Sequence, residues 1–237
     1  MSKYVIIGEK YAPLLTNSLD LLGYSTLILP DNPCVDPRLS CHADLSVFCD
    51  KNSIFLAKYL ENSAFYQEIN GLDMHCAFID EEQSAKYPHD AQLNVCAFGD
   101  KFIYNSRSAS RKIIEYLKAQ GREGIECRQG YTKCSVCTVD NNSLITSDSG
   151  IAEICRKAGL EVLEISPGHI ELGGFDYGFI GGASINLDDR MIAFTGALSS
   201  HPQREEIELF ISSRGIDIFY LTDMPAFDIG SGIVIKT

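Results

Sequence analysis

Five short amphipathic stretches along this chain each end in a glycine that leads directly into an apolar segment. A glycine just past a helix can turn left-handed without the steric cost of a Cβ atom, so each glycine predicts a helix end followed by a strand. The five are separated by 48, 50, 38 and 56 residues, and they are Gly23, Gly71, Gly121, Gly159 and Gly215. This quasi-regular spacing predicts a repeat architecture.

A second feature occurs once in each period. Two short apolar runs flank a turn of Asp, Asn or Gly, residues that tolerate tight-turn conformations, and this pattern predicts a β-hairpin. The hairpins are HADLSVF-CDKN-SIFLA, LNVCAF-GDK-FIYNS, CSVCTV-DNN-SLITS and GASINL-DDR-MIAFTG. The halves of a fifth hairpin stand at the two chain ends, KYVIIGEK and SGIVIKT. We therefore predict an α/β propeller of five ββαβ modules around a pseudo-five-fold axis, closed by pairing of the terminal strands.

Composition predicts one compact domain over residues 1–237, because 45% of the residues are apolar, 22% are charged and no low-complexity linker interrupts the chain. The net charge of −12 and the thin scatter of Lys and Arg argue against nucleic-acid binding, which needs a basic stripe. The N-terminus lacks a signal-peptide pattern and no run is long enough to span a membrane, so we expect a cytoplasmic protein. Its nine cysteines are then expected to be reduced.

The repeat register predicts which side chains meet at the axis. Taking the acid of each hairpin turn as the origin, the residues six positions earlier are Asp44, Asn94, Cys134 and Gly182, and Ser231 is the fifth equivalent when counted from Thr237. A slip of one residue would reverse every side chain. In this register four polar side chains converge on the axis.

His42 and Asp44 head the first hairpin. Two residues apart on a strand, they would face the same side. A carboxylate beside an imidazole raises its pKa and orients it, which suits a general acid and base. The alternative is a pair that makes local hydrogen bonds at a strand end.

Cys134 and Cys137 form a CxxC motif in the segment GYTKCSVC. We place the motif on a strand, whereas redox CxxC motifs usually open a helix. The only partners for a zinc site, Cys34 and the Cys41-His42 pair, have the wrong spacing, so we predict no metal and no cofactor. On a strand the two thiols would face opposite sides. Lys133 beside Cys134 would favour a thiolate.

The glycine-rich segment at residues 173–182 is not a dinucleotide fingerprint, because its spacing fails GxGxxG and a hairpin follows it. It is either a loop whose backbone approaches a ligand or a site of tight strand packing near the axis. Together with the register, it gives a set of candidate ligand-binding residues: Tyr131, Lys133, Asp176, Gly181, Gly182, Ser184 and Ser231.

Five ββαβ modules closed by the termini resemble the pentein, or guanidino-group-modifying enzyme, fold. That family includes arginine deiminases, dimethylarginine dimethylaminohydrolases, agmatine deiminases and amidinotransferases. His42-Ala43-Asp44 followed by Phe48 resembles the family's H-x-D strand. FIGGAS at residues 179–184 resembles its E-G-G-D strand, with Ile180 and Ala183 in place of the acids. The C-terminal segment DIGSG, where the enzymes carry a nucleophilic cysteine, has none. The chain is also similar to an uncharacterised bacterial pentein group with H-A-D, G-Y-T-K-C and G-F-I-G-G-A-S segments.

The resemblance implies a hydrolase or transferase that attacks a C–N bond of a small cationic guanidine-like ligand. Cys134 is the candidate nucleophile, His42 the general acid and base, and Asp44 the acid that offsets the substrate charge. With two family motifs altered, we expect weak or no turnover of arginine, agmatine or methylarginines. The alternative is a non-catalytic pentein that acts as a binding module, as the ribosome anti-association factor does. Nothing in the sequence indicates an oligomeric state.

Overall fold

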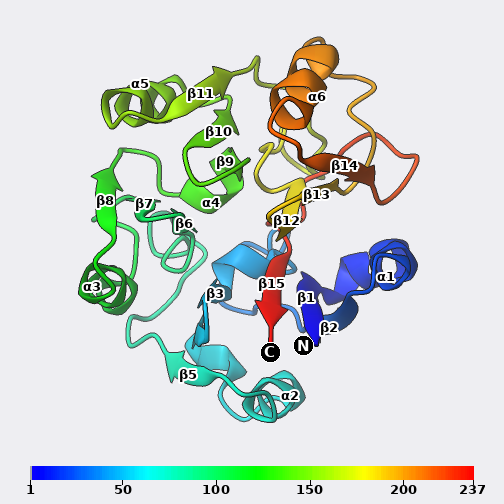
Figure 1. The fold of residues 1–237 in the computed structure, drawn as a ribbon. Helices are drawn as coiled ribbons and strands as arrows, with labels where there is room; N and C mark the ends of the chain where they lie inside the picture. The colour runs from blue at the N-terminus through cyan, green and yellow to red at the C-terminus, as the bar shows by residue number, and fades with distance from the viewer. Residues whose placement is uncertain (1) are drawn as a thin grey trace.

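The computed structural model describes residues 2–237 and shows five small sheets arranged around a centre, with the longer helices on the outside (Figure 1). Every sheet has three strands. They are β15-β1-β2 (Ile233–Lys236, Lys3–Gly8, Ser25–Leu29), β3-β4-β5 (Val47–Asp50, Ser53–Leu56, His75–Phe78), β6-β7-β8 (Cys96–Phe98, Lys101–Tyr104, Glu123–Glu126), β9-β10-β11 (Val136–Thr138, Ser143–Thr146, Glu161–Glu164) and β12-β13-β14 (Ser184–Asp188, Met191–Phe194, Asp217–Tyr220).

The middle strand of each sheet is antiparallel to the first strand and parallel to the third. Parallel neighbours need a crossover connection, and here each crossover contains one helix. These helices are α1 (Ala12–Leu21), α2 (Ala64–Asn70), α3 (Arg111–Ala119), α5 (Ser149–Lys157) and α6 (Arg204–Ser212). The short elements are η1 (Glu9–Tyr11), η2 (Ala43–Leu45), η3 (Lys58–Leu60) and α4 (Thr132–Ser135). Among residues 2–237, no helix has the length and hydropathy needed to cross a membrane.

The predicted ring closure is confirmed. β15 pairs antiparallel with β1, from Lys3 opposite Lys236 to Ile6 opposite Ile233, and Figure 1 shows the two termini side by side. The backbones of Ser2 and Thr237 exchange two further hydrogen bonds of 2.8 and 3.0 Å. The last strand therefore completes the first sheet.

Four of the five glycines behave as predicted. Gly23, Gly121, Gly159 and Gly215 have φ between +71° and +83°, the region that a Cβ atom disfavours. Gly71 is different, because it caps α2 with a right-handed φ of −78°. There the chain passes through Leu72 to Met74 before β5 begins, so no left-handed residue is needed.

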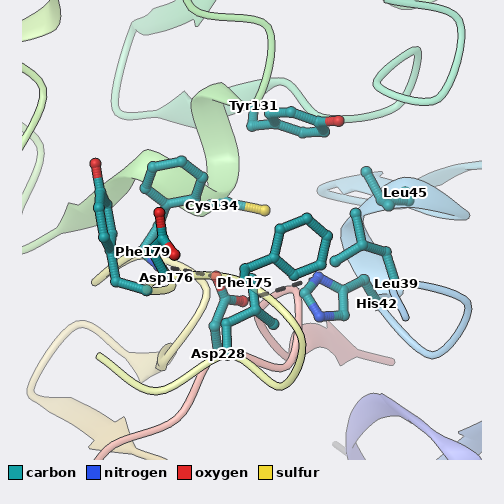
Figure 2. Close-up of a pocket in the computed structure, with 11 residues that line it drawn as sticks. Leu39, His42, Leu45, Tyr131, Cys134, Phe175, Asp176, Phe179 and Asp228 are labelled. Atoms are coloured by element: carbon teal, nitrogen blue, oxygen red, sulfur yellow. Dashed lines mark hydrogen bonds and ion pairs between the residues drawn. The ribbon is translucent and has the colours of Figure 1, made fainter. Parts of the chain in front are cut away.

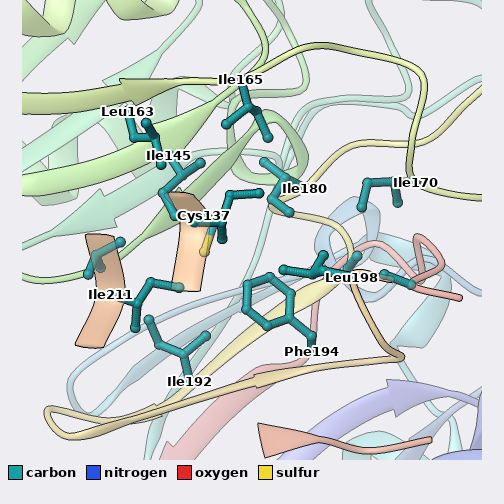
Figure 3. Packing of buried hydrophobic residues seen from close by; sticks show 14 of the residues in the cluster. Cys137, Ile145, Leu163, Ile165, Ile170, Ile180, Ile192, Phe194, Leu198 and Ile211 are labelled. Carbon is teal, nitrogen blue, oxygen red and sulfur yellow. The ribbon is translucent and has the colours of Figure 1, made fainter. Parts of the chain in front are cut away.

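Five buried apolar clusters hold the ring together, and each lies between neighbouring modules. Figure 3 shows the cluster in which Cys137, Ile145 and Leu163 of the fourth sheet meet the fifth module, including Ile192 and Phe194. The other four clusters join the remaining neighbours in the same way. Each fully buried large apolar side chain contributes roughly 1.5–3 kcal/mol to stability. Since these side chains pack between modules, each module is stabilised mainly by the modules beside it.

Candidate functional site

The predicted axial register is confirmed by a set of hydrogen bonds that connects its five positions. Asp44 N donates to Gly230 O (3.0 Å), and Ser231 N donates to Gly182 O (2.9 Å). Gly182 N donates to Cys134 O (2.8 Å). Asn94 completes the connection, since its Oδ1 accepts from the backbone of Cys134 (3.3 Å). Residues from all five modules therefore meet at the axis.

The local structure at two of these positions differs from the prediction. His42 and Asp44 do not lie on a strand, because Asp44 belongs to the 3-10 turn η2 and His42 precedes that turn. Cys134 lies in the single helical turn α4 rather than on a strand, and β9 begins only at Val136. The prediction that the two thiols of the CxxC motif separate still holds, because Cys137 lies in the cluster of Figure 3 whereas Cys134 faces a pocket.

The pocket is a cavity of about 330 Å³ with Cys134, His42 and Asp228 at its base. Figure 2 shows the Cys134 sulfur directed into the space between Tyr131 and Asp228. The walls come from two further groups of side chains: Leu39, Leu45 and Tyr131 on one side, and Leu172, Phe175, Asp176, Tyr177 and Phe179 on the other. The second group belongs to residues 172–179, which we call the pocket loop.

Cys134, Asp44 and His42 form a compact buried group beneath this pocket. One candidate ligand atom from each of the three side chains lies within 4.8 Å of the others. Cys134 Sγ donates to Asp44 Oδ2 (2.8 Å) and accepts from Asn94 Nδ2 (3.2 Å). Asp44 Oδ1 and His42 Nε2 are buried and have no hydrogen-bond partner.

Burial keeps this group uncharged. Burial raises the pKa of the Cys134 thiol well above its usual value, and the nearby Asp44 and Asp228 carboxylates raise it further. Burial also raises the pKa of Asp44 to about 8, against the opposing effect of the hydrogen bond from Cys134. The pKa of His42 is lowered, again mainly by burial. A thiolate favoured by Lys133 is therefore not what the structure shows.

Asp228 is the site residue that sequence reasoning missed. Its carboxylate accepts from Phe179 N (2.9 Å) and Gly230 N (2.8 Å), and Oδ1 lies 3.8 Å from His42 Nδ1, beyond hydrogen-bonding distance. A side chain at Gly182 would overlap this carboxylate. Gly182 of the FIGGAS segment thus makes room for an acid from the C-terminal segment, and the DIG motif beside the expected fifth axial position was the available signal.

The other predicted ligand-binding residues fall into three groups. Tyr131 and Asp176 line the pocket. Lys133 instead lines a smaller cavity of about 50 Å³ together with Asp44. Gly181, Gly182, Ser184 and Ser231 lie behind the pocket, where the hydroxyls of Ser231 and Ser184 both donate to Gly181 O (2.7 and 3.1 Å).

The group of His42, Asp44 and Cys134 also has the chemistry of a zinc site, because imidazole, carboxylate and thiolate are the usual protein ligands of Zn²⁺. Three such ligands with one open position are typical of catalytic rather than structural zinc. The repeat register predicted that these three residues meet at the axis, but it gave no zinc-ligand spacing, because His42 and Asp44 belong to one module and Cys134 to another that is not its neighbour in the chain. The same atoms also suit metal-free chemistry with a cysteine nucleophile.

Comparison with known sequences identifies the family. The profile of a family of unknown function, DUF6873, matches residues 6–233. The chain belongs to this family. No curated protein matches the sequence of this DUF6873 member.

Solved structures similar to the DUF6873 chain have the pentein fold. One is dimethylarginine dimethylaminohydrolase from Pseudomonas aeruginosa, a cysteine-to-serine mutant complexed with citrulline, with 13% identity, a TM-score of 0.59, and 98% of this chain and 96% of that chain covered. Others are an amidinotransferase from Microseira wollei (11% identity, TM-score 0.51, 92% and 87% covered) and agmatine deiminase from C. jejuni (10% identity, TM-score 0.50, 93% and 87% covered). The fold prediction is thus confirmed, and these guanidino-modifying enzymes are the structural neighbours of the chain.

Proposed function

We propose that this protein is a hydrolase or amidinotransferase-like enzyme that attacks a C–N bond of a small guanidine-like cation, with Cys134 as nucleophile and His42 as general acid and base. The observation that carries the proposal is the group of Cys134, His42, Asp44 and Asp228 at the base and underside of one pocket. A buried thiol beside an imidazole and two carboxylates has the groups that nucleophilic attack on a cationic carbon requires.

A bound cation would activate the thiol. In the free protein burial and the two neighbouring acids keep the pKa of Cys134 high. A guanidinium placed above Sγ would supply a positive charge, which favours the thiolate and lowers that pKa. The same cation would be offset by Asp228, whose carboxylate is already oriented by two backbone N–H groups. The nucleophile would thus be formed only when substrate is present.

The proposed reaction needs no reagent other than the substrate and water, and every proton that is released is taken up again. The thiol proton passes to His42, Sγ bonds to the guanidinium carbon, and the leaving amine departs as the C–N bond breaks and the imidazolium returns the proton. Water then gives a proton to the neutral imidazole while its oxygen bonds to the same carbon. The C–S bond breaks and the thiolate recovers its proton. In a transferase, an acceptor amine replaces water in the second half.

The test is to trap the covalent intermediate. The protein is incubated with guanidine and amidine compounds, quenched in acid and digested, and the peptide containing Cys134 is examined by mass spectrometry for an added amidino group. We expect this adduct and release of amine or ammonia, both absent in Cys134→Ala. Cys137→Ala is the matched control, because that buried thiol lies outside the pocket. Turnover that persists in Cys134→Ala would overturn the assignment.

A non-catalytic binding module is the second candidate, and the raised pKa of the free Cys134 thiol favours it. In that case the pocket would bind the same class of cation, and the affinity would survive in Cys134→Ala without any adduct in the wild type. We expect negligible turnover of arginine in either case, because no Lys or Arg in the part of the chain that the structure describes lines the pocket to pair with the carboxylate of arginine.

A further inference from the structure

The pocket above the reactive group combines fixed negative charge with a large apolar wall. Four aromatic rings line it, from Tyr131 and from Phe175, Tyr177 and Phe179 of the pocket loop, and three leucines add to the same surface. Figure 2 shows labelled rings of this group on opposite sides of the space that the Cys134 sulfur enters. The charged side chains that line the pocket are the carboxylates of Asp176 and Asp228. Such a pocket favours a cation attached to an apolar body.

The pocket loop is held in place by its own contacts. Arg38 Nη1 donates to Gly174 O (2.8 Å), and its guanidinium lies 4.1 Å from the centroid of the Phe175 ring. At the other end Asp228 accepts from Phe179 N. The rings of Tyr177 and Phe179 pack edge to face at 89°. A wall fixed in this way costs little conformational entropy when a ligand binds.

The guanidinium of Arg38, which contacts this wall, is already engaged. Arg38 makes a bidentate interaction with Asp36 through Nε and Nη2 (2.9 and 2.7 Å), in addition to its contacts with the loop. His42, inside the pocket, has a pKa lowered by burial and is neutral. Because no Lys or Arg of residues 2–237 is among the residues that line the pocket, a ligand carboxylate would be desolvated next to Asp176 and Asp228 without a cationic partner in the lining, which is unfavourable.

We infer that the ligand of this pocket is a guanidinium or amidinium cation whose far end is apolar and uncharged, an aryl or branched-alkyl guanidine rather than an amino acid. The inference rests on the proposed function for the orientation of the ligand, with its cationic carbon above Cys134. The guanidinium lies at Asp228, and the apolar body packs between Tyr131 and the rings of the pocket loop. Phe175 and Tyr177 are then the residues that determine specificity.

The experiment measures binding in Cys134→Ala, which cannot turn the ligand over, by isothermal titration calorimetry at pH 7. The probes are 2-phenylethylguanidine, arginine, agmatine and the uncharged analogue 2-phenylethylurea. We expect 2-phenylethylguanidine to bind at least tenfold more tightly than each of the other three. Equal or tighter binding of arginine or agmatine would overturn the inference.

Variants of the wall test which residues are responsible. Adding Phe175→Ala is expected to weaken binding of 2-phenylethylguanidine about tenfold and to leave arginine unaffected, and Phe175→Leu should restore part of the affinity. Phe175 is 38% exposed, so its removal should leave the core intact. Phe219→Ala removes a similarly exposed ring outside the pocket and is the matched control. Equal losses for both ligands in Phe175→Ala would also contradict the inference.

The two proposals fail in distinguishable ways. If the preference for the aryl guanidine holds in Cys134→Ala but the wild type never forms an adduct, the proposed function fails and the ligand class stands. If the wild type turns over arginine with loss in Cys134→Ala, the proposed function stands and the ligand class is wrong.

Discussion

The hydrogen bond between Cys134 and Asp44 makes the reactivity of the thiol depend on the state of the carboxyl group. Sγ lies 2.8 Å from Asp44 Oδ2, and burial raises the pKa of Asp44 to about 8. A thiolate and a carboxylate at that separation repel by about 6 kcal/mol at an effective dielectric constant of 20, equivalent to about four pKa units. The two groups therefore lose their first proton as a pair and resist losing the second.

The substitution Asp44→Asn removes this coupling and keeps the shape of the side chain. In the wild type the thiolate fraction rises with pH until the pair has lost one proton near pH 8, and it then levels off because the carboxylate holds the remaining negative charge. In Asp44→Asn the thiolate fraction continues to rise about tenfold per pH unit, because no carboxylate competes for the negative charge. The alkylation rate follows the thiolate fraction. The ratio of the mutant rate to the wild-type rate should therefore grow about tenfold between pH 7 and pH 9.

The assay is alkylation by iodoacetamide, with the modified Cys134 peptide quantified by mass spectrometry at half-unit steps from pH 6 to pH 9.5. Cys96 is the internal control, because it is fully buried and burial is the main cause of its raised pKa. Its labelling rate should be the same in both proteins. Parallel pH profiles for Cys134 in wild type and mutant would refute the coupling.

Three further predictions concern stability. Gly182→Ala should destabilise the protein severely and lower its urea midpoint, because the new Cβ would overlap the carboxylate of Asp228. Gly173→Ala is the control and should leave the urea midpoint nearly unchanged, because a Cβ there meets no atom of residues 2–237 within 4 Å. Ile235→Ala should cost about 2–5 kcal/mol of unfolding free energy and the half-buried Val234→Ala clearly less, and equal losses would contradict the ring closure. The folded pKa of Asp44 is raised, so its stabilising neutral form is fully present below pH 4 and lost as pH rises towards 8. The melting temperature of Asp44→Asn should therefore exceed that of the wild type by a margin that widens from pH 4 to pH 8.

The sequence by itself determined the ring. Helix-ending glycines, hairpin turns and two unpaired terminal strands are local features, and local conformational preference fixes them without knowledge of the neighbours. Counting from the turn acids also gave the axial positions, because equivalent residues of a ring converge. That count brought Asp44, Asn94 and Cys134 together correctly, although they are 50 and 40 residues apart along the chain.

Only the tertiary structure decided the conformation and chemistry at the axis. At the axis Asp44 lies in a 3-10 turn and Cys134 in a single helical turn, where an isolated strand pattern had predicted extended backbone. The role of Asp228 was hidden because its place above Gly182 depends on contact between two modules. The high pKa of Cys134 could not be read from the adjacent Lys133 either. Burial and the field of residues distant in sequence set that pKa, and both arise only when the ring has closed.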